Sequence, residues 1–323
     1  MRKKPRDTLA RSAMKLLCTL LGIILAVMIA ATWCFQHLMD QIHTIPPSGD
    51  SVLPVFSLSA VTEKAQTLSA ITDENRVINV LLIGQDRREG ESQARSDSMI
   101  LCSYHPATGS LTMTSFLRDL YLPIPGHGSN RINAAYAFGG MNLLEQTIEE
   151  NFGIAINGSV EVDFQQFSGI IDLLGGVTIA LRQDEAEVIN RETGSSLTAG
   201  EQTLTGLQAL TYSRIRSLDP DGDISRTGRQ RKVMTALLRT VRQAGPAKVL
   251  PLVNQLLPMI TTNFSSGQLL LLAMEIAPGL LDLQSTSQQI PAEGTFSDAT
   301  VDGMQVLVAD LDANRELLFK YTK

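Results

Sequence analysis

Four short polar clusters in the middle of the chain contain arginine, three of them together with aspartate, in a way that suits phosphate chemistry. They are RSDS at 95–98, LRD at 117–119, YSRIR at 212–216 and GDISRTGRQ at 222–230. Beyond residue 39 the chain has 16 arginines and only 5 lysines. A solvated surface uses lysine as readily, whereas the planar guanidinium binds two phosphate oxygens at once. Aspartates among such arginines suggest a divalent cation on the same phosphates, because hard cations prefer oxygen ligands.

The first cluster lies between two strands that the sequence predicts. Val77–Gly84 is an apolar run that ends in glycine, and the loop after it carries Asp86 and Arg88. The next strand begins at RSDS, which supplies Arg95 and Asp97. If these strands are neighbours, both aspartates face one pocket, and a Mg²⁺ (or Mn²⁺) ion can bind them together with phosphate oxygens and water. The sequence therefore predicts a metal site at Asp86 and Asp97.

Two further clusters follow other expected elements. Arg118 and Asp119 come directly after a strand expected at 111–116. Arg214 and Arg216 are two residues apart, so in an extended segment both side chains point to one face. We therefore expect these residues to emerge beside the first cluster.

The last cluster opens a helix expected at 226–243. Arg226 and Gln230 are four residues apart, so they share one face near the helix amino terminus, where the dipole favours anions. A single arginine–aspartate pair is more often a surface salt bridge than a site. A buried network that only stabilises the fold is also a poor explanation, because it pays a large desolvation penalty. The combination favours a polyanionic ligand.

Expected strands alternate with expected helices along the rest of the chain beyond residue 75. This alternation predicts an α/β fold, with an α-β-α layered domain around a central mixed sheet. The other expected strands are 98–104, 160–164 and 177–181, and the other expected helices are 133–151, 167–174 and 205–212, the last capped by Thr205.

Composition and missing motifs exclude several classes of protein. The three cysteines, Cys18, Cys34 and Cys102, cannot form a disulfide framework, and the four histidines have no metal-ligand spacing. The chain has no GxxxxGK[ST], GxGxxG, HExxH or GxSxG motif. These absences argue against a nucleotide-triphosphate pump, a dinucleotide dehydrogenase, a zincin and a serine hydrolase.

The amino terminus predicts a membrane anchor. Residues 16–35 are uncharged over 20 positions, which is long enough to cross a bilayer. Residues 1–39 carry six Lys/Arg and one acid (+5), whereas the remainder carries 21 Lys/Arg and 32 acids (−11). The positive-inside rule then places the amino terminus in the cytoplasm and the rest outside. We expect a cytoplasmic tail at 1–15, a single transmembrane helix at 16–36, a linker at 37–75 and a catalytic domain at 76–323.

Together these motifs resemble the LytR–CpsA–Psr family of membrane-anchored cell-wall assembly proteins. The similarity runs from about residue 77 to 232 and is carried by VLLIGQDRR, RSDS, SFLRDLYLPIPG, RINAAYAFGG, IDLLGGV, GLQALTYSRIR and GDISRTGRQR, in the family's order. The resemblance implies an α-β-α fold that holds a polyprenyl phosphate in an apolar cavity. We expect the helix at 133–151 to form one wall of that cavity.

The resemblance also implies roles for single residues. Asp86 and Asp97 match the metal-binding aspartates, and Asp223 matches a position in the family's GD…R segment without a clear role. Leu117 stands where the family commonly has proline, so we expect a less constrained loop there. The matches to the pyrophosphate-binding residues are Arg88, Arg95, Arg118, Arg214, Arg216, Arg226 and Gln230.

The implied activity is transfer of a phosphate-linked glycopolymer from undecaprenyl pyrophosphate to peptidoglycan at the outer face of the cytoplasmic membrane. Arginines at 95, 118, 214, 216 and 226 would neutralise the leaving phosphate, and Asp119 or Asp97 would act as the base. A prenyl-pyrophosphate phosphatase and a non-catalytic envelope lipid-binding or regulatory protein are the alternatives. A basic tail of about 15 residues is too short to form a DNA-binding domain, so we expect no nucleic-acid partner.

Overall fold

The computed structural model describes residues 43–44, 77–85, 96–265 and 283–322, with 268–269, 272, 275–276 and 279 between the last two ranges. The chain divides into two compact units, 1–42 and 43–323, and all described residues belong to the second. The expected cytoplasmic tail and membrane span therefore lie outside the described residues. Within the described ranges, the helices are all too short or too polar to cross a bilayer.

Seven strands form the central sheet, in the order β1-β10-β7-β2-β3-β4-β11. β3 is antiparallel to both of its neighbours, whereas β7 runs parallel to β2 and β11 runs parallel to β4. The sheet is therefore mixed, as the sequence predicts. Its strands are β1 (His43–Thr44), β2 (Ile78–Gln85), β3 (Ser96–His105), β4 (Ser110–Phe116), β7 (Gly158–Asp163), β10 (Thr261–Thr262) and β11 (Gln284–Ile290).

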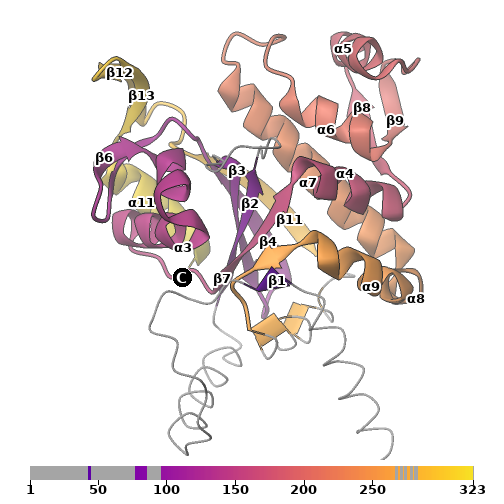
Figure 1. The fold of residues 1–323 in the computed structure, drawn as a ribbon, viewed down its shortest axis with the longest axis horizontal. Coiled ribbons are helices and arrows are strands. Elements are labelled where there is room, and N and C mark those ends of the chain that lie inside the picture. Colours follow the sequence, from indigo (N-terminus) through magenta and orange to yellow (C-terminus); the bar gives the residue numbers. More distant parts are fainter. Residues whose placement is uncertain are drawn as a thin grey trace, which may run out of the picture. The chain divides into compact units, whose positions relative to one another are not determined.

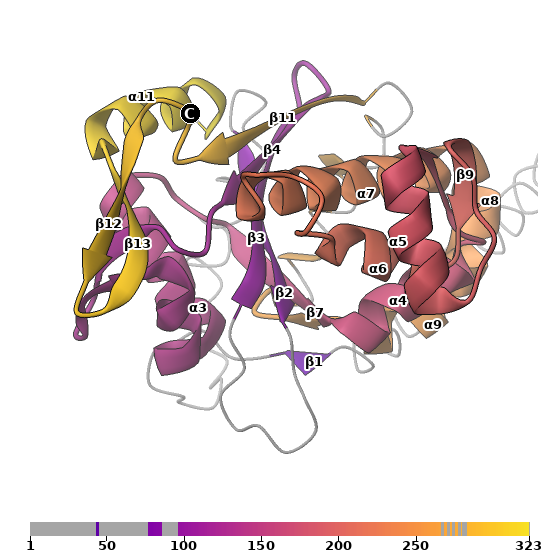
Figure 2. The same cartoon turned by 90° about the horizontal axis from the view of Figure 1, so that it is seen from above.

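Helices cover both faces of this sheet, which confirms the expected α/β layers (Figures 1 and 2). On one side lie α3 (Ile132–Phe152) and α11 (Leu311–Thr322). On the other side lie α4 (Phe164–Leu173), α6 (Gly206–Arg214) and α7 (Asp223–Ala244). The smaller elements are α5 (Gln183–Thr193), α8 (Pro246–Val249), η1 (Leu250–Leu252), α9 (Val253–Leu256), η2 (Leu257–Met259), β5 (Tyr121–Ile124), β6 (Gly128–Arg131), β8 (Val177–Leu181), β9 (Gly200–Leu204), β12 (Phe296–Val301) and β13 (Met304–Ala309).

Side chains at alternating positions of the strands point to opposite faces of the sheet and pack in two separate cores. Leu81 and Leu101 pack with Leu144 of α3 in one cluster. Val80 and Ile100, one position away on the same strands, pack in a second cluster against the α7 side. Each fully buried side chain of this size contributes roughly 1.5–3 kcal/mol, so a register slip by one residue would exchange the two cores and is strongly disfavoured.

The strand expected at 177–181 forms as β8 but lies outside the central sheet. It pairs antiparallel with β9 in a separate two-stranded sheet that packs with α5 and α6. Gly176 makes this pairing possible, because its φ is +98° and an added Cβ would lie 2.8 Å from the carbonyl oxygen of Leu204. This sheet packs in a lobe formed with α5, α6 and the start of α7, and the segment between α6 and α7 belongs to that lobe.

The helix expected at 133–151 is interrupted. Gly139 and Gly140 have non-helical φ/ψ values inside α3, with φ of +64° at Gly140. Apolar spacing alone cannot reveal such a break, because the two segments keep a common buried face. The expected cap of α6 is confirmed, since the Thr205 side chain accepts a hydrogen bond from the backbone N–H of Gln208.

Candidate functional site

Asp97 lies in a β-bulge at the start of β3. Gly84 pairs with Ser98, and the next residue, Gln85, pairs with Ser96, so Asp97 is the extra residue between the two pairs. A bulge bends the strand and changes the direction of its side chains, and bulges are frequent beside active sites. The strand therefore presents the carboxylate of Asp97, which is 25% exposed, at the edge of the sheet.

The segment after β4 is held firmly by its backbone. The N–H of Leu117 donates to the carbonyl of Ile290 at 2.8 Å, and the carbonyl of Asp119 accepts from the N–H of Leu307 at 2.9 Å. Leu117 is also buried. The expectation that leucine loosens this loop is therefore wrong, because leucine supplies a backbone donor that proline lacks. Arg118, between these two anchors, starts from a fixed backbone.

Arg118 contacts three carboxylates at once. Its Nη1 lies 3.3 Å from Oδ1 of Asp97, and its Nε lies 3.6 Å from Oδ2 of Asp119 and 3.5 Å from Oδ1 of Asp223. Burial lowers the pKa of Arg118, but the charges of Asp223, Asp119 and Asp97 together raise that pKa above its ordinary value. The guanidinium is therefore a permanent positive charge in a partly buried position.

Asp223, at the first turn of α7, is shared by three arginines. Besides Arg118, its carboxylate binds Nη2 of Arg226 at 2.9 Å and lies 3.8 Å from Nε of Arg216. Arg226 is only 2% exposed, and its Nη2 also lies 3.4 Å from the backbone carbonyl of Asp97. Burial raises the pKa of Asp223, and Asp119 and Asp97 add to this rise against the opposing effect of Arg118 and Arg216. We call Arg118, Arg216, Arg226, Asp97, Asp119 and Asp223 the arginine cluster.

Arg214 has a different position from the one expected. It is the last residue of α6, and only Ile215, the cap residue after it, has extended backbone angles. The expectation of one extended segment is wrong, because the helix continues two residues further than the apolar spacing indicates. The guanidinium of Arg214 lies over the ring of Phe164, 4.7 Å from the ring centroid, while Arg216 reaches Asp223.

Several buried polar atoms in and beside the cluster have no hydrogen-bond partner in the described part of the chain. Among them are Nε of Arg118, Nε of Arg226, Oδ1 of Asp119 and Oε1 of Gln230. Buried donors without partners are rare in native proteins, because each costs roughly 1–3 kcal/mol. The guanidinium groups beside the carboxylate of Asp223 therefore have donors without hydrogen bonds. Such donors are suited to binding an anion.

An apolar cavity of about 230 Å³ lies between the central sheet and the helices α4, α6 and α7. Its apolar lining includes Leu82 and Ile100 from the sheet and Leu210, Met234 and Leu237 from the helices. The expectation that the helix at 133–151 forms a wall is wrong for this cavity, since α3 packs on the opposite face of the sheet. Periodicity shows which face of a helix is buried but not which face of the sheet it covers.

Some polar residues that line the cavity are neighbours of predicted binding residues in the chain. Ser98, Ser213 and Gln230 are among the lining residues. Each of them is within four positions in sequence of a predicted site residue, namely Asp97, Arg214 and Arg226. Ser98 directly follows Asp97, whose carboxylate contacts Arg118 and whose backbone carbonyl contacts Arg226, so the arginine cluster lies beside the cavity. An apolar cavity beside an arginine cluster suits a molecule with an apolar tail and a phosphate head.

Three predicted residues, Asp86, Arg88 and Arg95, lie outside the described residues. Within the part that the structure describes, no group of three or more His, Cys, Asp or Glu side chains is arranged to hold a metal ion. The metal site at Asp86 and Asp97 stays a prediction.

Sequence reasoning missed two contributors to the cluster. Asp223 received no role, although it is the carboxylate that joins the arginines. Arg131, at the end of β6, was not named at all, yet its Nε lies 3.2 Å from Oδ1 of Asp119. Arg131 lies far in sequence from most of the other arginines, so its spacing does not predict a contact with them. Its place in the RINAAYAFGG motif was the only available signal.

Comparison with known proteins gives consistent matches. The LytR_cpsA_psr family model matches residues 56–320. The polyisoprenyl-teichoic acid–peptidoglycan teichoic acid transferase TagU of Oceanobacillus iheyensis is 33% identical over 223 residues, which is 67% of either chain. TagU of Bacillus mycoides is 38% identical over 172 residues, covering 53% of this chain and about half (55%) of its own length.

A solved structure of TagT bound to LI-WTA superimposes with a TM-score of 0.65 at 25% identity. The match covers 86% of this chain and 99% of that one. The family model, the sequence relatives and the shared α/β architecture agree, and this chain belongs to the LytR_cpsA_psr family.

Proposed function

We propose that this chain transfers a phosphate-linked anionic glycopolymer, such as a teichoic acid, from an undecaprenyl-pyrophosphate carrier to peptidoglycan. The observation that carries this proposal is the arginine cluster beside an apolar cavity. A polyprenyl pyrophosphate needs both parts, since its head carries several negative charges and its tail is hydrocarbon. The names of the TagU relatives include a polyisoprenyl donor and a peptidoglycan acceptor, which supports the same assignment.

The proposed reaction exchanges one phosphorus–oxygen bond for another. The oxygen of a peptidoglycan sugar hydroxyl forms a bond to the phosphorus that carries the polymer. The bond from that phosphorus to the bridging oxygen breaks, and polyprenyl phosphate leaves with the bonding electrons. Arg118, Arg216 and Arg226 stabilise the negative charge that develops on the leaving phosphate, which is the main contribution a protein makes to phosphoryl transfer.

The hydroxyl proton passes to a carboxylate of the cluster. Asp97 and Asp119 are both suited to this role, because both are about one-quarter exposed and both lie beside Arg118. We also propose that Asp97 and Asp86 hold Mg²⁺, since Asp86 directly follows Gln85, whose backbone pairs with Ser96. When bound, the ion supplies positive charge that polarises the phosphoryl oxygens.

The proposed location follows from the donor. Its tail lies in the cytoplasmic membrane, so the enzyme is anchored there by one helix at 16–36, with the amino terminus in the cytoplasm and the catalytic domain outside. The charge asymmetry between residues 1–39 and the remainder supports this orientation.

A reconstituted assay tests the proposed function against its alternatives. The full chain is supplied with lipid-linked wall polymer, Mg²⁺ and peptidoglycan fragments, and the products are analysed by mass spectrometry. We expect a phosphodiester between polymer and muropeptide. Release of phosphate without a muropeptide product would identify a phosphatase instead, and binding of the donor without turnover would identify a lipid-binding protein.

A further inference from the structure

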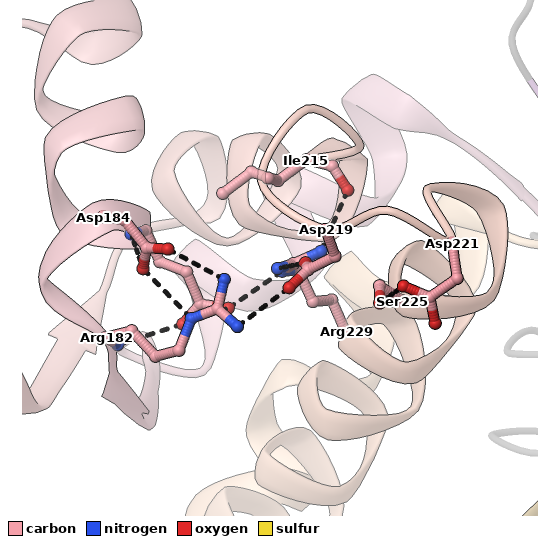
Figure 3. Close-up of polar contacts among 8 residues, drawn as sticks. Arg182, Asp184, Ile215, Asp219, Asp221, Ser225 and Arg229 are labelled. Atoms are coloured by element: carbon pink, nitrogen blue, oxygen red, sulfur yellow. Dashed lines mark hydrogen bonds and ion pairs between the residues drawn. The ribbon is translucent and has the colours of Figure 1, made fainter.

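A second group of charged residues lies next to the arginine cluster, in the lobe formed by α5, α6 and the start of α7. Figure 3 shows Arg229 of α7 reaching toward Asp219 and the backbone of Ile215. Arg182, just before α5, binds Asp219 from the other side at 2.9 Å. None of these residues belongs to the proposed phosphate-binding set, and their role is open.

Arg229 is the centre of this group, and every part of its guanidinium has a partner. Its Nε donates to Oε1 of Glu185 at 2.9 Å, its Nη1 donates to the carbonyl of Ile215 at 3.2 Å, and its Nη2 binds Oδ2 of Asp219. The side chains of Arg229 and Glu185 are only 4% and 3% exposed. We call Arg229, Glu185 and Asp219 the Arg229 clamp.

The clamp holds the segment on both sides of Arg216. Ile215 precedes Arg216 directly and Asp219 follows three residues later, so the two contacts of Arg229 bracket it. Arg216 itself is 43% exposed, and its ion pair with Asp223 spans 3.8 Å, which is too long for a strong hydrogen bond. The contacts of Arg229 therefore hold the backbone on both sides of Arg216, from which the Arg216 side chain extends.

Stability alone is a poor reason for this network. Burying ions carries a desolvation penalty that a close ion pair only roughly offsets, and apolar residues of similar volume often serve the fold as well. Fixing a loop arginine before the ligand arrives has a separate benefit, because binding then loses less conformational entropy. A clamp that ties α5 to the loop and to α7 suits this second role.

We propose that Arg229, through Glu185 and Asp219, is a positioning residue that keeps Arg216 directed at the pyrophosphate of the donor. This inference rests on the proposed function, because it assumes that the arginine cluster binds a pyrophosphate. Arg229 acts through Arg216 and does not itself contact the substrate. The inference predicts an energetic coupling between these two arginines that a purely structural network lacks.

The experiment measures affinity of the full chain, in detergent, for inorganic pyrophosphate by titration calorimetry. The variants are Arg229→Gln, Arg216→Ala, Arg118→Ala and the combination of Arg229→Gln with each of the other two, at a temperature where circular dichroism shows each to be folded. Asp219→Asn is a milder second variant for use if Arg229→Gln does not fold, because it removes the negative charge that Arg229 and Arg182 share. Arg315→Gln on α11 is the matched control, since Arg315 also binds a backbone carbonyl and an aspartate, far from the segment 215–222 in sequence.

We expect Arg229→Gln and Asp219→Asn each to weaken pyrophosphate binding at least fivefold, and Arg315→Gln to change it less than twofold. Adding Arg229→Gln to Arg216→Ala should cause little further loss, whereas adding it to Arg118→Ala should multiply the two losses. Unchanged affinity in both clamp variants, or independent losses with Arg216→Ala, would overturn the inference and leave the proposed function intact. Failure of the unaltered chain to bind pyrophosphate would instead contradict the proposed function.

Discussion

Asp223 is the carboxylate that three arginines of the site share. It contacts Arg118, Arg216 and Arg226 with one carboxylate. A pyrophosphate entering the cluster would compete with Asp223 for the same donors, and each phosphate oxygen could take a charge-assisted hydrogen bond of roughly 1.5–3 kcal/mol. The carboxylate therefore brings the three arginines together and is also the charge that the ligand must displace.

Replacing arginine by lysine tests whether the bidentate fork is needed. We predict that Arg118→Lys and Arg216→Lys each lower the rate of transfer at least about tenfold, equivalent to ~1.4 kcal/mol. Thermal stability should change little, because lysine keeps the positive charge opposite the carboxylates. Steady-state rates and thermal melts are the measurements, with Arg315→Lys as the control. Full activity in both variants would mean that the arginines only form a structural network.

The raised pKa of Asp223 predicts a pH dependence of anion binding. A carboxyl group is neutral below its pKa, and a neutral Asp223 no longer repels an incoming phosphate. Affinity for pyrophosphate should therefore rise as the pH falls toward that pKa. This rise is measured after subtracting the change in affinity that the protonation of pyrophosphate itself causes. Asp223→Asn should remove this extra rise. Identical pH profiles for the unaltered chain and the variant would contradict the prediction.

Residue types and spacing identified most of the described cluster but not its centre. Arg118, Arg216 and Arg226 could be predicted because arginines at the ends of strands and helices suit phosphate. The role of Asp223 could not, since an aspartate at the first turn of a helix also stabilises the helix dipole without any site. Arg229 was missed for a related reason, because its partners at 185 and 219 become neighbours only when α5 packs against α7.

At the scale of elements, the bulge in β3 and the cavity beside α7 determine where a ligand can bind. The register between β2 and β3 shifts at Gly84/Gln85, which leaves Asp97 without a partner residue on β2 at the end of the strand. The sequence predicted both strands and their hairpin partner β4, because apolar runs between glycine and proline are strong strand signals. The bulge and the break in α3 could not be predicted, since each depends on a local change of one or two residues.

Filling the cavity separates recognition of the tail from recognition of the head. Met234 of α7 lines the cavity, so Met234→Trp should reduce its volume. We predict at least about tenfold weaker binding of a long polyprenyl pyrophosphate, ~1.4 kcal/mol, with unchanged affinity for inorganic pyrophosphate. Titration of the folded variant with both ligands is the measurement. Equal loss for both ligands would show a general distortion, and no loss for either would place the tail elsewhere.

At the scale of the whole molecule, the layered fold followed from the alternation of strands and helices, whereas the separate β8–β9 sheet did not. Five-residue strands give no sign of which sheet they join, and Gly176 acts only through its contact with β9. The two sides of the central sheet also have different roles. One side packs α3 and α11 into a core, and the other holds the cavity and the lobe that carries Arg214 and Arg216.

The proposed anchoring predicts a defined topology. The uncharged run at 16–35 and its basic flank place the carboxyl terminus outside the cytoplasm. A reporter that is active only in the cytoplasm should be silent when fused after Lys323 and active when fused before Met1. Cytoplasmic activity at the carboxyl terminus would exclude the proposed orientation.

The most direct test of the central claim is an experimental structure of the full chain with a polyprenyl pyrophosphate. We expect phosphate oxygens within ~2.7–3.2 Å of guanidinium nitrogens of Arg118, Arg216 and Arg226, with the first part of the tail between the sheet and α7. Asp223 should lose at least one of its three arginine contacts to the phosphate. A pyrophosphate bound elsewhere, with all three arginines still on Asp223, would contradict the account.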